Sequence, residues 1–335
     1  MTISPSPRAG GRAGALLALA AAMLAAGSSA ALALEAAGPD AREKLELLRT
    51  ALWIALPVAL LATAALAHAL LFPQHRLGPR AARWMVVGGG LALPGIALTA
   101  MLLVLPRGPL PAAAEAGPTI EIVARQFWWE IRYAGPAPGA PAVVTANELH
   151  IPAGVPVRLR LTSRDVIHGF AIPALGGAAD LVPGRTEELV LRADAPGAFR
   201  AACYAFCGVQ HAHMALPVLA MPRDEWQTWL RAQAAAAAAP QAGPALQGRD
   251  IFIASGCGSC HAVRGHGADG EAGPDLTHFA SRETIGAGML PNTRAALTGW
   301  IAATQQIKPG AKMPSFHLLT GPELHALATY LEGLR

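Results

Sequence analysis

The sequence predicts a membrane-anchored, multidomain chain: a two-helix transmembrane hairpin, then an all-β sandwich, then a C-terminal all-α domain. Three observations predict this order. Two long uncharged apolar runs lie in the first third of the chain, short alternating segments fill its middle, and helical periodicity returns near its end. Of the 335 residues, 14% are charged and 53% are hydrophobic. Soluble domains carry about 25% charged residues, so the composition indicates membrane segments and excludes a disordered chain.

The N-terminus has the three parts of an export signal. Arg8 and Arg12 precede the apolar run 13–26, and the small residues that follow end in Ala31-Leu-Ala33. This pattern predicts a signal peptide over residues 1–33, with an additional membrane helix as the alternative.

The two apolar runs cover about residues 50–72 and 84–105 and predict a transmembrane hairpin within residues 40–110. Each run exceeds the roughly 20 residues that cross a hydrocarbon core about 30 Å thick. The loop between them carries three Arg and no acid. Because short basic loops stay in the cytoplasm, we expect everything after the hairpin on the outer, periplasmic side of a bacterial plasma membrane.

The net charge of +4 is not evenly distributed along the chain. Residues 1–110 hold nine basic and four acidic residues, so the excess lies among the apolar segments. A basic excess placed there indicates membrane topology, and nucleic acid is excluded as a partner.

Residues 118–222 have the pattern of short strands. Residues 119–125 and 156–162 alternate, which places Val157, Leu159 and Leu161 on one face. Such strands at regular spacing without intervening helices predict a β-sandwich.

A helix and an Ala/Pro-rich linker, residues 223–247, lead to a second domain over residues 248–335. In that domain, residues 293–305 and 321–334 show the 3.6-residue periodicity of amphipathic helices.

The all-α domain opens with Cys257-Gly-Ser-Cys260-His261. This spacing is typical of covalent haem c, with two thioether bonds and an axial histidine. The alternative, a dithiol redox pair, needs no histidine and is found near a βαβ pattern, which is not predicted here. Met313, followed by a proline, is the predicted sixth ligand of the iron, and Met289, much closer to the motif, is the alternative. Methionine opposite histidine suits electron transfer rather than oxygen chemistry.

This domain resembles class I cytochrome c from about residue 248 to 335. The resemblance is carried by the haem motif, by Gly273-Pro-Asp-Leu276, by the Met313-Pro314 pair and by the closing helix.

The β domain carries a second cluster of metal-ligand residues. Its members are Cys203, Cys207, His211 and Met214 in the spacing C-x3-C-x3-H-x2-M, with His168 upstream. Thiolate, imidazole and thioether ligands suit copper, and the second cysteine favours a copper pair over a mononuclear site. A Cys203–Cys207 disulfide, chemically allowed in an exported protein, is the alternative, but it leaves the other ligand types unexplained. The spacing selects His211, so His213 is interpreted as a neighbour of the site.

Residues 40–230 resemble subunit II of the haem–copper cytochrome c oxidases, which carries the binuclear CuA centre. Besides the copper motif, the resemblance rests on residues 149–154, 165–168, 170–173 and 180–185. It implies a cupredoxin-like sandwich, and with the haem domain the chain is similar to the cytochrome-c-fused form of that subunit. The ligands it implies are Cys203 and Cys207 as bridging thiolates, His168 and His211 as terminal ligands, Met214 as a weak ligand and the Ala205 backbone carbonyl.

Two departures from that family matter. Ala205 replaces the usual glutamate, whose side chain helps to hold a magnesium ion, so the resemblance implies intact copper binding and an altered or absent magnesium site. Phe127 stands where a tryptophan usually receives electrons. Phe127, Trp128 and Trp129 are therefore the candidates for receiving electrons, and their alternative role is packing in the sandwich core or at the membrane interface.

The function implied is that of the subunit through which electrons enter a terminal oxidase. Electrons would pass from cytochrome c, or from an upstream respiratory complex, through haem c and CuA to a separate subunit I that reduces oxygen to water in a proton-translocating complex. Two alternatives remain open: the small subunit of a CuA-containing nitric oxide reductase, and a membrane-tethered copper and haem electron carrier. No residue of this chain is expected to catalyse oxygen reduction itself.

Overall fold

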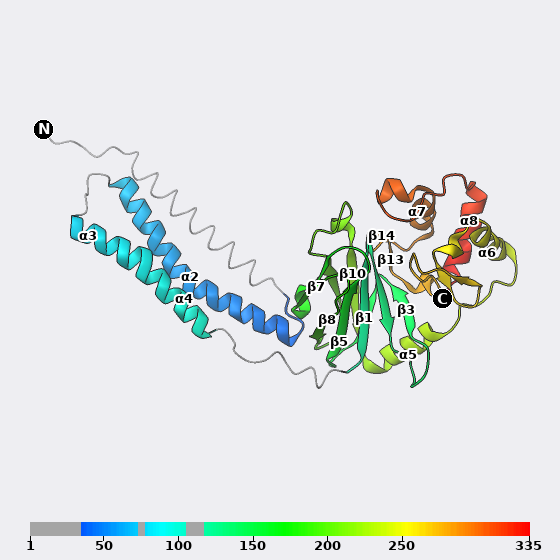
Figure 1. Cartoon of the computed structure of the whole chain (residues 1–335), viewed down its shortest axis with the longest axis horizontal. Helices are drawn as coiled ribbons and strands as arrows, with labels where there is room; N and C mark the ends of the chain where they lie inside the picture. The colour runs from blue at the N-terminus through cyan, green and yellow to red at the C-terminus, as the bar shows by residue number, and fades with distance from the viewer. Residues whose placement is uncertain (1–34, 73–77, 105–116) are drawn as a thin grey trace. The chain divides into compact units, whose positions relative to one another are not determined.

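The computed structural model describes residues 35–72, 78–104 and 117–335. The predicted signal peptide at 1–33, the centre of the basic loop and most of the linker at 105–116 lie outside the described residues. The chain divides into two compact units, one containing residues 42–110 and the other containing residues 36–41 and 111–335 (Figure 1).

The first unit contains two apolar helical segments. Helix α2 (Pro39–Leu71) has a mean hydropathy of 2.1, and the second segment, Pro79–Leu103, has 2.0. The second segment consists of α3 (Pro79–Trp84), a π-helical stretch η1 (Met85–Ala92) and α4 (Leu93–Val104). Both are long and apolar enough to cross a membrane, and together they indicate a membrane anchor.

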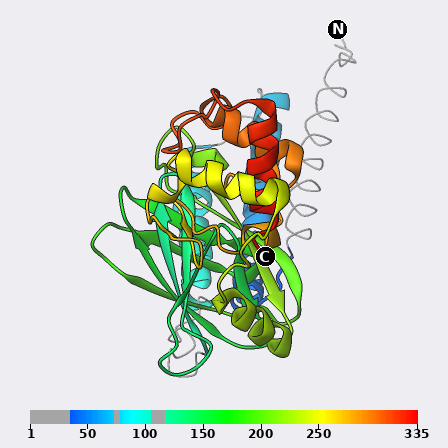
Figure 2. The ribbon, with the colours of Figure 1, turned by 90° about the vertical axis from the view of Figure 1, so that its right-hand side faces the viewer.

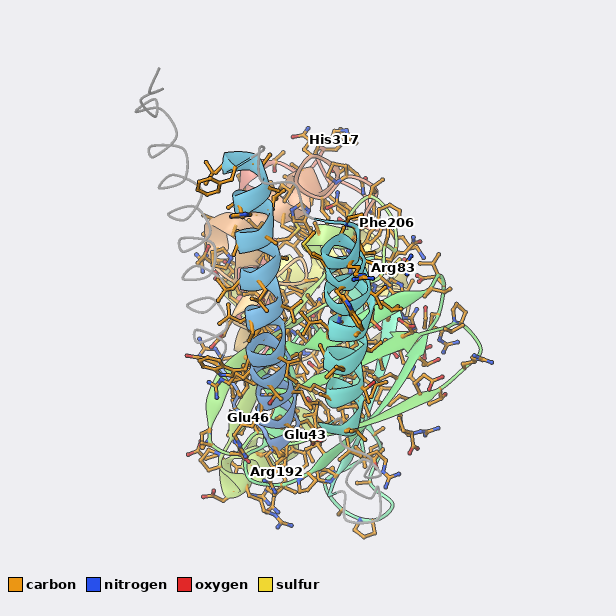
Figure 3. All side chains as sticks on the ribbon, turned by 90° about the vertical axis from the view of Figure 1, so that its left-hand side faces the viewer. Glu43, Glu46, Arg83, Arg192, Phe206 and His317 are labelled. Atoms are coloured by element: carbon orange, nitrogen blue, oxygen red, sulfur yellow. The ribbon has the colours of Figure 1, made fainter. Side chains whose placement is uncertain are left out.

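Helix α2 begins before its apolar run. The helix starts at Pro39, whereas the uncharged run starts at residue 50, and its first turns are polar. Figure 3 shows Glu43 and Glu46 on these turns, where Glu46 pairs with Arg49 at 2.5 Å. Asp40 lies in the first turn, where an acidic side chain interacts favourably with the helix dipole and stabilises this polar start of the helix.

The middle of the chain is a sandwich of two five-stranded sheets. One sheet has the order β3-β2-β1-β5-β8, with β1 (Thr119–Arg125), β2 (Trp128–Tyr133), β3 (Val143–Ala146), β5 (Val157–Ser163) and β8 (Glu187–Leu191). The other has the order β4-β10-β9-β6-β7, with β4 (Leu149–Pro152), β6 (His168–Ile172), β7 (Gly177–Leu181), β9 (Gly197–Ala202) and β10 (Ala215–Met221).

The sandwich core follows from the alternation along the strands. Val157, Leu159 and Leu161 of β5 are all fully buried, as their spacing predicts. In the register of this sheet, Ile122 of β1 lies beside Ile131 of β2 and beside Leu161. The two inner faces share one apolar cluster, so the predicted cupredoxin-like sandwich is confirmed.

The C-terminal domain is helical, as predicted. Its helices are α6 (Gly243–Ala254), α7 (Arg294–Ile307) and α8 (Gly321–Glu332), and α5 (Arg223–Ala234) precedes them. Two short hairpins, β11–β12 (Ala262–Val263 and Ala268–Asp269) and β13–β14 (Thr284–Ile285 and Leu290–Pro291), complete it. The expected domain start at residue 248 falls inside α6.

Helices α6 and α8 cross at very close range (Figure 2). A Cβ added at Gly248 would lie 2.0 Å from the carbonyl oxygen of Ala326, so only glycine fits at the crossing. Phe252 and Tyr330 meet edge to face beside it, with their ring centroids 5.6 Å apart. This crossing fixes α6, whose C-terminal end leads directly into the haem motif.

Candidate metal centres

The loop of residues 203–214, called the copper loop below, joins two neighbouring strands of the sandwich. Cys203 follows β9 directly, and Met214 precedes β10 directly. The two strands pair antiparallel up to Ala202 and Ala215, and the Cys203 amide donates to the Met214 carbonyl at 3.1 Å. His168 is the first residue of β6, which lies beside β9 in the same sheet. Sheet geometry, rather than the loop alone, therefore sets the positions of the ligands.

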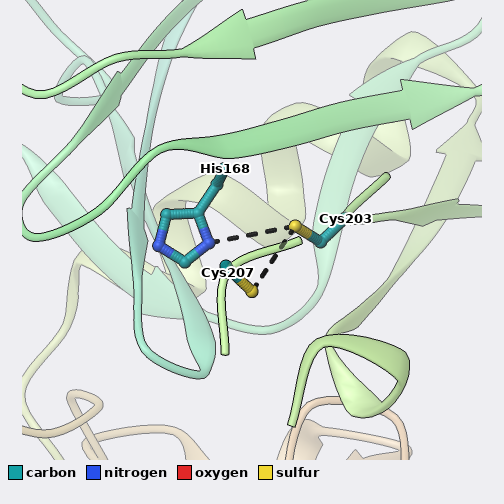
Figure 4. Close-up of side chains that lie close together, drawn as sticks. All are labelled: His168, Cys203 and Cys207. Carbon is teal, nitrogen blue, oxygen red and sulfur yellow. Dashed lines mark hydrogen bonds between the residues drawn. The ribbon is translucent and has the colours of Figure 1, made fainter. Parts of the chain in front are cut away.

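The predicted copper ligands converge. The Sγ atoms of Cys203 and Cys207 lie 3.8 Å apart, and Nδ1 of His168 lies 3.9 Å from the first sulfur (Figure 4). On the other side, Nδ1 of His211 lies 3.8 Å from the Cys207 sulfur. The Ala205 carbonyl oxygen lies 3.2 Å from the Cys203 sulfur. The arrangement is two thiols between two imidazoles, with a backbone carbonyl at one edge.

The disulfide alternative does not describe this structure. Both cysteines are free, and their separation of 3.8 Å greatly exceeds the length of about 2.05 Å that a disulfide bond requires. The donor atoms of His168, Cys203 and Cys207 lie within 4.8 Å of one another, which suits a metal ion. Met214 is 1% exposed and packs in the same apolar cluster as the two cysteines.

The electrostatics of the two thiols differ. Burial opposes ionisation of Cys203, but hydrogen bonds with the side chain of His168 and the backbone of Gly169 outweigh it and lower the pKa of this thiol. Burial and the negative charge on Cys203 raise the pKa of Cys207. A metal that requires both thiolates must therefore displace a proton from at least Cys207 near neutral pH.

Asp165 orients His168, although this carboxylate is not among the site residues predicted from the sequence. Its Oδ1 lies 2.9 Å from Nε2 of His168, and its Oδ2 accepts from the Gln126 amide at 2.7 Å. Burial acts against the charge of Asp165, but the bond with His168 and two backbone amides lower its pKa to about 2. The signal was available in the sequence: a carboxylate three residues before a predicted ligand histidine, in a turn that leads into a strand.

His213 lies beside the site without facing the thiols. Its Nδ1 contacts Oε1 of Gln210 at 2.9 Å. Phe206, in the same loop, is 81% exposed and is labelled in Figure 3.

The haem motif forms a short 3₁₀ turn, η5 (Cys257–Ser259), directly after α6. Nδ1 of His261 lies 2.7 Å from the Pro274 carbonyl, so this nitrogen donates and Nε2 is left free to bind a metal. A Cβ added at Gly273 would lie 2.6 Å from the imidazole, which shows how closely the Gly-Pro segment packs on it. Burial lowers the pKa of His261 and keeps the ring neutral, as axial ligation requires. These residues fit a covalent haem c.

Met313 lies in the loop between α7 and α8. It packs against the same apolar cluster as Cys257 and Leu276. Nε2 of Gln305 donates to the carbonyls of Ala311 and Met313, both at 2.6 Å. This single side chain thus braces the loop that carries the predicted axial thioether.

Met289, the alternative axial residue, lies in the turn between β13 and β14. Its amide donates to the Ile285 carbonyl at 3.2 Å. Two residues earlier, the Ala287 carbonyl accepts from the Ala215 amide of the sandwich at 3.2 Å. This turn therefore takes part in the contact with the sandwich.

The three candidate aromatics differ in their surroundings. Trp129 is fully buried in the sandwich core, with its ring centroid 6.4 Å from that of His168. Phe127 is 6% exposed and packs against the copper loop, because a Cβ on Gly208 would lie 3.0 Å from its ring. Trp128 is half-buried, and the guanidinium of Arg125 lies 5.3 Å from its ring centroid. Trp129 therefore occupies the core position that the alternative interpretation describes, yet it lies beside the predicted copper ligand.

The helical domain contacts the copper loop directly. Nε2 of Gln210 donates to the Pro309 carbonyl at 2.9 Å, and the Lys308 ammonium donates to the carbonyls of Phe127 and His213 at 3.0 and 2.8 Å. Sequence reasoning missed Lys308, because a lysine before a Pro-Gly turn has the pattern of an exposed residue.

Comparisons with known proteins agree with this architecture. Residues 138–221 match the family profile described as cytochrome c oxidase subunit II, periplasmic domain, and residues 245–335 match the profile described as cytochrome c. The fold and the two clusters thus define a class: a membrane-anchored protein that joins an oxidase-type copper domain to a cytochrome c domain.

Among the relatives of this chain are proteins that carry the name cytochrome c oxidase subunit 2. The protein of Alkalihalophilus pseudofirmus is 36% identical over 245 residues, which is 73% of this chain and 69% of that protein. The protein of Bacillus subtilis is 31% identical over 232 residues, 66% of this chain and 64% of its own length. The solved periplasmic domain of subunit II from Bradyrhizobium japonicum is 28% identical, covers 35% of this chain and 94% of its own, and superposes with a TM-score of 0.33.

The chain belongs to the cytochrome c oxidase subunit 2 family. Membership of this family implies association with the other subunits of an oxidase. The sandwich indicates copper and the C-terminal domain indicates haem as the cofactors.

Proposed function

We propose that this chain is the subunit through which electrons enter a haem–copper terminal oxidase. In this proposal, electrons from cytochrome c or an upstream respiratory complex reach a haem c in the C-terminal domain, pass to a binuclear CuA centre in the sandwich, and continue to a separate subunit I that reduces oxygen to water. When bound, each of the two cofactors would supply a one-electron carrier. The observation that carries the proposal is the pair of free thiols 3.8 Å apart, each with an imidazole nitrogen within 3.9 Å.

The residues have distinct tasks. Cys257 and Cys260 would attach the haem, and His261 and Met313 would ligate its iron. The copper pair would be held by Cys203, Cys207, His168 and His211, with Met214 and the Ala205 carbonyl as weaker ligands. Ala205 has no carboxylate, so this position cannot supply a side-chain ligand to magnesium.

The contact between the domains supports transfer within one chain. Lys308 of the helical domain donates to the carbonyl of Phe127, which is one of the three candidate electron-accepting aromatics, and to the carbonyl of His213 in the copper loop. A tethered domain held on this surface does not have to be captured from solution, because the tether keeps its effective concentration high.

Exposed apolar side chains near the copper ligands suit a partner. Phe206 is 81%, Val209 76% and Ile167 52% exposed, and each stands within two residues of a predicted ligand. Large exposed apolar residues grouped in this way mark interaction surfaces. We propose that subunit I covers these side chains.

We also propose a location for the chain. The hairpin lies in the bacterial plasma membrane, and both metal domains lie on the outer side of that membrane. The N-terminal 33 residues serve as a signal peptide.

The experiment is a metal and spectroscopic analysis of the full chain, matured with haem and loaded with copper. One iron and two coppers per chain, with an electron paramagnetic resonance spectrum of one electron shared by both coppers, are expected. A single localised copper, or no copper with a Cys203–Cys207 disulfide, would overturn the proposal. Purification with the partner subunits, followed by assays with oxygen and with nitric oxide, tests the terminal reaction; turnover of nitric oxide alone would contradict an oxidase.

A further inference from the structure

Lys308 is the C-cap residue directly after α7, and its ammonium lies deep in the protein. The residue is 3% exposed, and Nζ donates to the carbonyls of Gly286, His213 and Phe127 at 2.7, 2.8 and 3.0 Å. An ammonium has three N–H donors, so each one is used.

The three acceptors belong to three separate segments. Gly286 lies in the β13–β14 turn of the helical domain, and His213 lies in the copper loop, next to Met214. Phe127 lies between β1 and β2, in the aromatic segment. One side chain of the helical domain therefore ties its own turn to the copper loop and to the aromatic segment that packs against this loop.

The charge of Lys308 is held by carbonyl dipoles. In the part of the chain that the structure describes, no carboxylate forms an ion pair with this ammonium within 4.0 Å. A buried charge without a counter-ion is costly unless every hydrogen bond is made, so these three segments must keep their relative positions for the charge to be tolerated. This requirement makes Lys308 specific for one docked arrangement.

Other contacts cross the same junction, but each of them joins only two segments, although Glu148 is as buried as Lys308, at 3% exposed. Oε1 of Glu148 accepts from the amides of Glu283 and Thr284 at 2.6 and 3.2 Å. The Lys312 ammonium lies 3.6 Å from Asp165, but its side chain is 65% exposed, so solvent screens this pair.

We propose that Lys308 is the positioning residue that docks the haem domain on the copper loop in one orientation and thereby sets the rate of electron transfer between the two centres. This inference rests on the proposed function. The tether alone keeps the two domains near each other. Electron transfer also requires a short and constant distance between the haem and copper sites, because electron tunnelling slows steeply with distance.

The test uses the full chain, loaded with haem and copper, and the variant Lys308→Met, which keeps the length of the side chain and removes its donors. Pulsed electron paramagnetic resonance measures the distribution of haem–copper distances, and laser-flash reduction of the haem measures the transfer rate. We expect the distribution to broaden and the rate to fall at least tenfold, while the haem absorption and the copper hyperfine pattern stay unchanged. Lys308→Arg keeps the positive charge and the N–H donors, so its transfer rate should lie between that of the wild type and that of Lys308→Met.

Lys312→Met is the matched control, since this exposed lysine crosses the same junction four residues further on. Its rate should stay within twofold of the wild type, with the wild-type distance distribution. A wild-type distribution and rate in Lys308→Met would overturn the inference. If that variant does not accumulate, the same result in Lys308→Arg overturns it, because a planar guanidinium cannot reproduce three converging N–H bonds.

Failure of the inference and failure of the proposed function are distinguishable. A wild-type chain that shows no transfer from haem to copper, or that holds a single copper, refutes the proposed function before any variant is compared. A wild-type chain that transfers electrons, together with an unchanged Lys308→Met, refutes only the role of Lys308.

Discussion

Asp165 and His168 form a pair in which Oδ1 of the carboxylate lies 2.9 Å from Nε2 of the imidazole. A proton on Nε2 leaves the lone pair of Nδ1 available, and that nitrogen is the one 3.9 Å from the Cys203 sulfur. The carboxylate thus selects the tautomer and aims the ring, although it lies outside the predicted ligand set.

Replacing this carboxylate should weaken copper binding. We expect Asp165→Asn to lower the copper affinity roughly 10- to 100-fold. A neutral amide orients the imidazole less strongly than a carboxylate does, and it lacks the negative charge that makes the imidazole more basic. A competitive copper titration of the full chain measures the effect. Asp269→Asn, at an exposed position on β12, is the control and should bind copper as the wild type does. Equal affinity in both variants would show that Asp165 does not orient the ligand.

Gly273 should tolerate no side chain. The Cβ of Gly273→Ala would lie 2.6 Å from Cε1 and 2.9 Å from Nδ1 of His261, so the ring must move and its bond to Pro274 must weaken. We expect a loss of about 1–3 kcal/mol in unfolding free energy and an altered haem spectrum. Gly299→Ala on α7, with open space around it, is the matched control and should be neutral or stabilising. An unperturbed spectrum in Gly273→Ala would contradict this packing.

Gln305 should control methionine ligation. Gln305→Leu removes two hydrogen bonds to the carbonyls of Ala311 and Met313 and one from the Gly310 amide. The loop should then lose about 1–3 kcal/mol of stabilisation, and exogenous imidazole should displace Met313 more readily. The absorption band of methionine-ligated ferric haem reports this displacement. Gln241→Leu, an exposed residue before α6, serves for comparison; equal imidazole affinities in the two variants would show that Gln305 does not brace the loop.

The chain has three tyrosines, and all three should ionise late. Burial raises the pKa of Tyr330 to about 12, and burial together with the Asp180 carboxylate raises the pKa of Tyr204 to about 12. Burial also raises the pKa of Tyr133 far above its usual range. An ultraviolet titration of the folded chain at pH 10.5 should therefore show little tyrosinate, whereas the unfolded chain should show most of it.

The sign of the resulting pH effect follows from linkage. The unfolded tyrosine releases its proton near pH 10, before the folded one does, so the stabilisation is complete below pH 10 and is lost as the pH rises toward 12. Between pH 10 and 12, the unfolding free energy of Tyr330→Phe should therefore depend less on pH than that of the wild type. Early tyrosinate absorbance in the folded chain would contradict the burial.

Several features could be predicted from the sequence because their signals are local. The apolar runs of the hairpin, the alternation that buries Val157, Leu159 and Leu161, and the spacing of Cys257, Cys260 and His261 each lie within a few turns of chain. The cysteine, histidine and methionine spacing in the copper loop is local too. His168 lies 35 residues before Cys203, and its role as a terminal ligand follows from the resemblance, since no spacing rule connects it to the loop.

The sequence by itself determined the order of the parts and the chemical types of the ligands, because hydrophobic periodicity and ligand spacing are properties of short segments. Tertiary structure alone decided which distant groups meet. It placed His168 beside the thiol of Cys203, 35 residues away, and the Lys308 ammonium on carbonyls 95 and 181 residues away in the chain. A backbone carbonyl has the same chemistry at every position, so only the fold identifies those that converge on one buried charge.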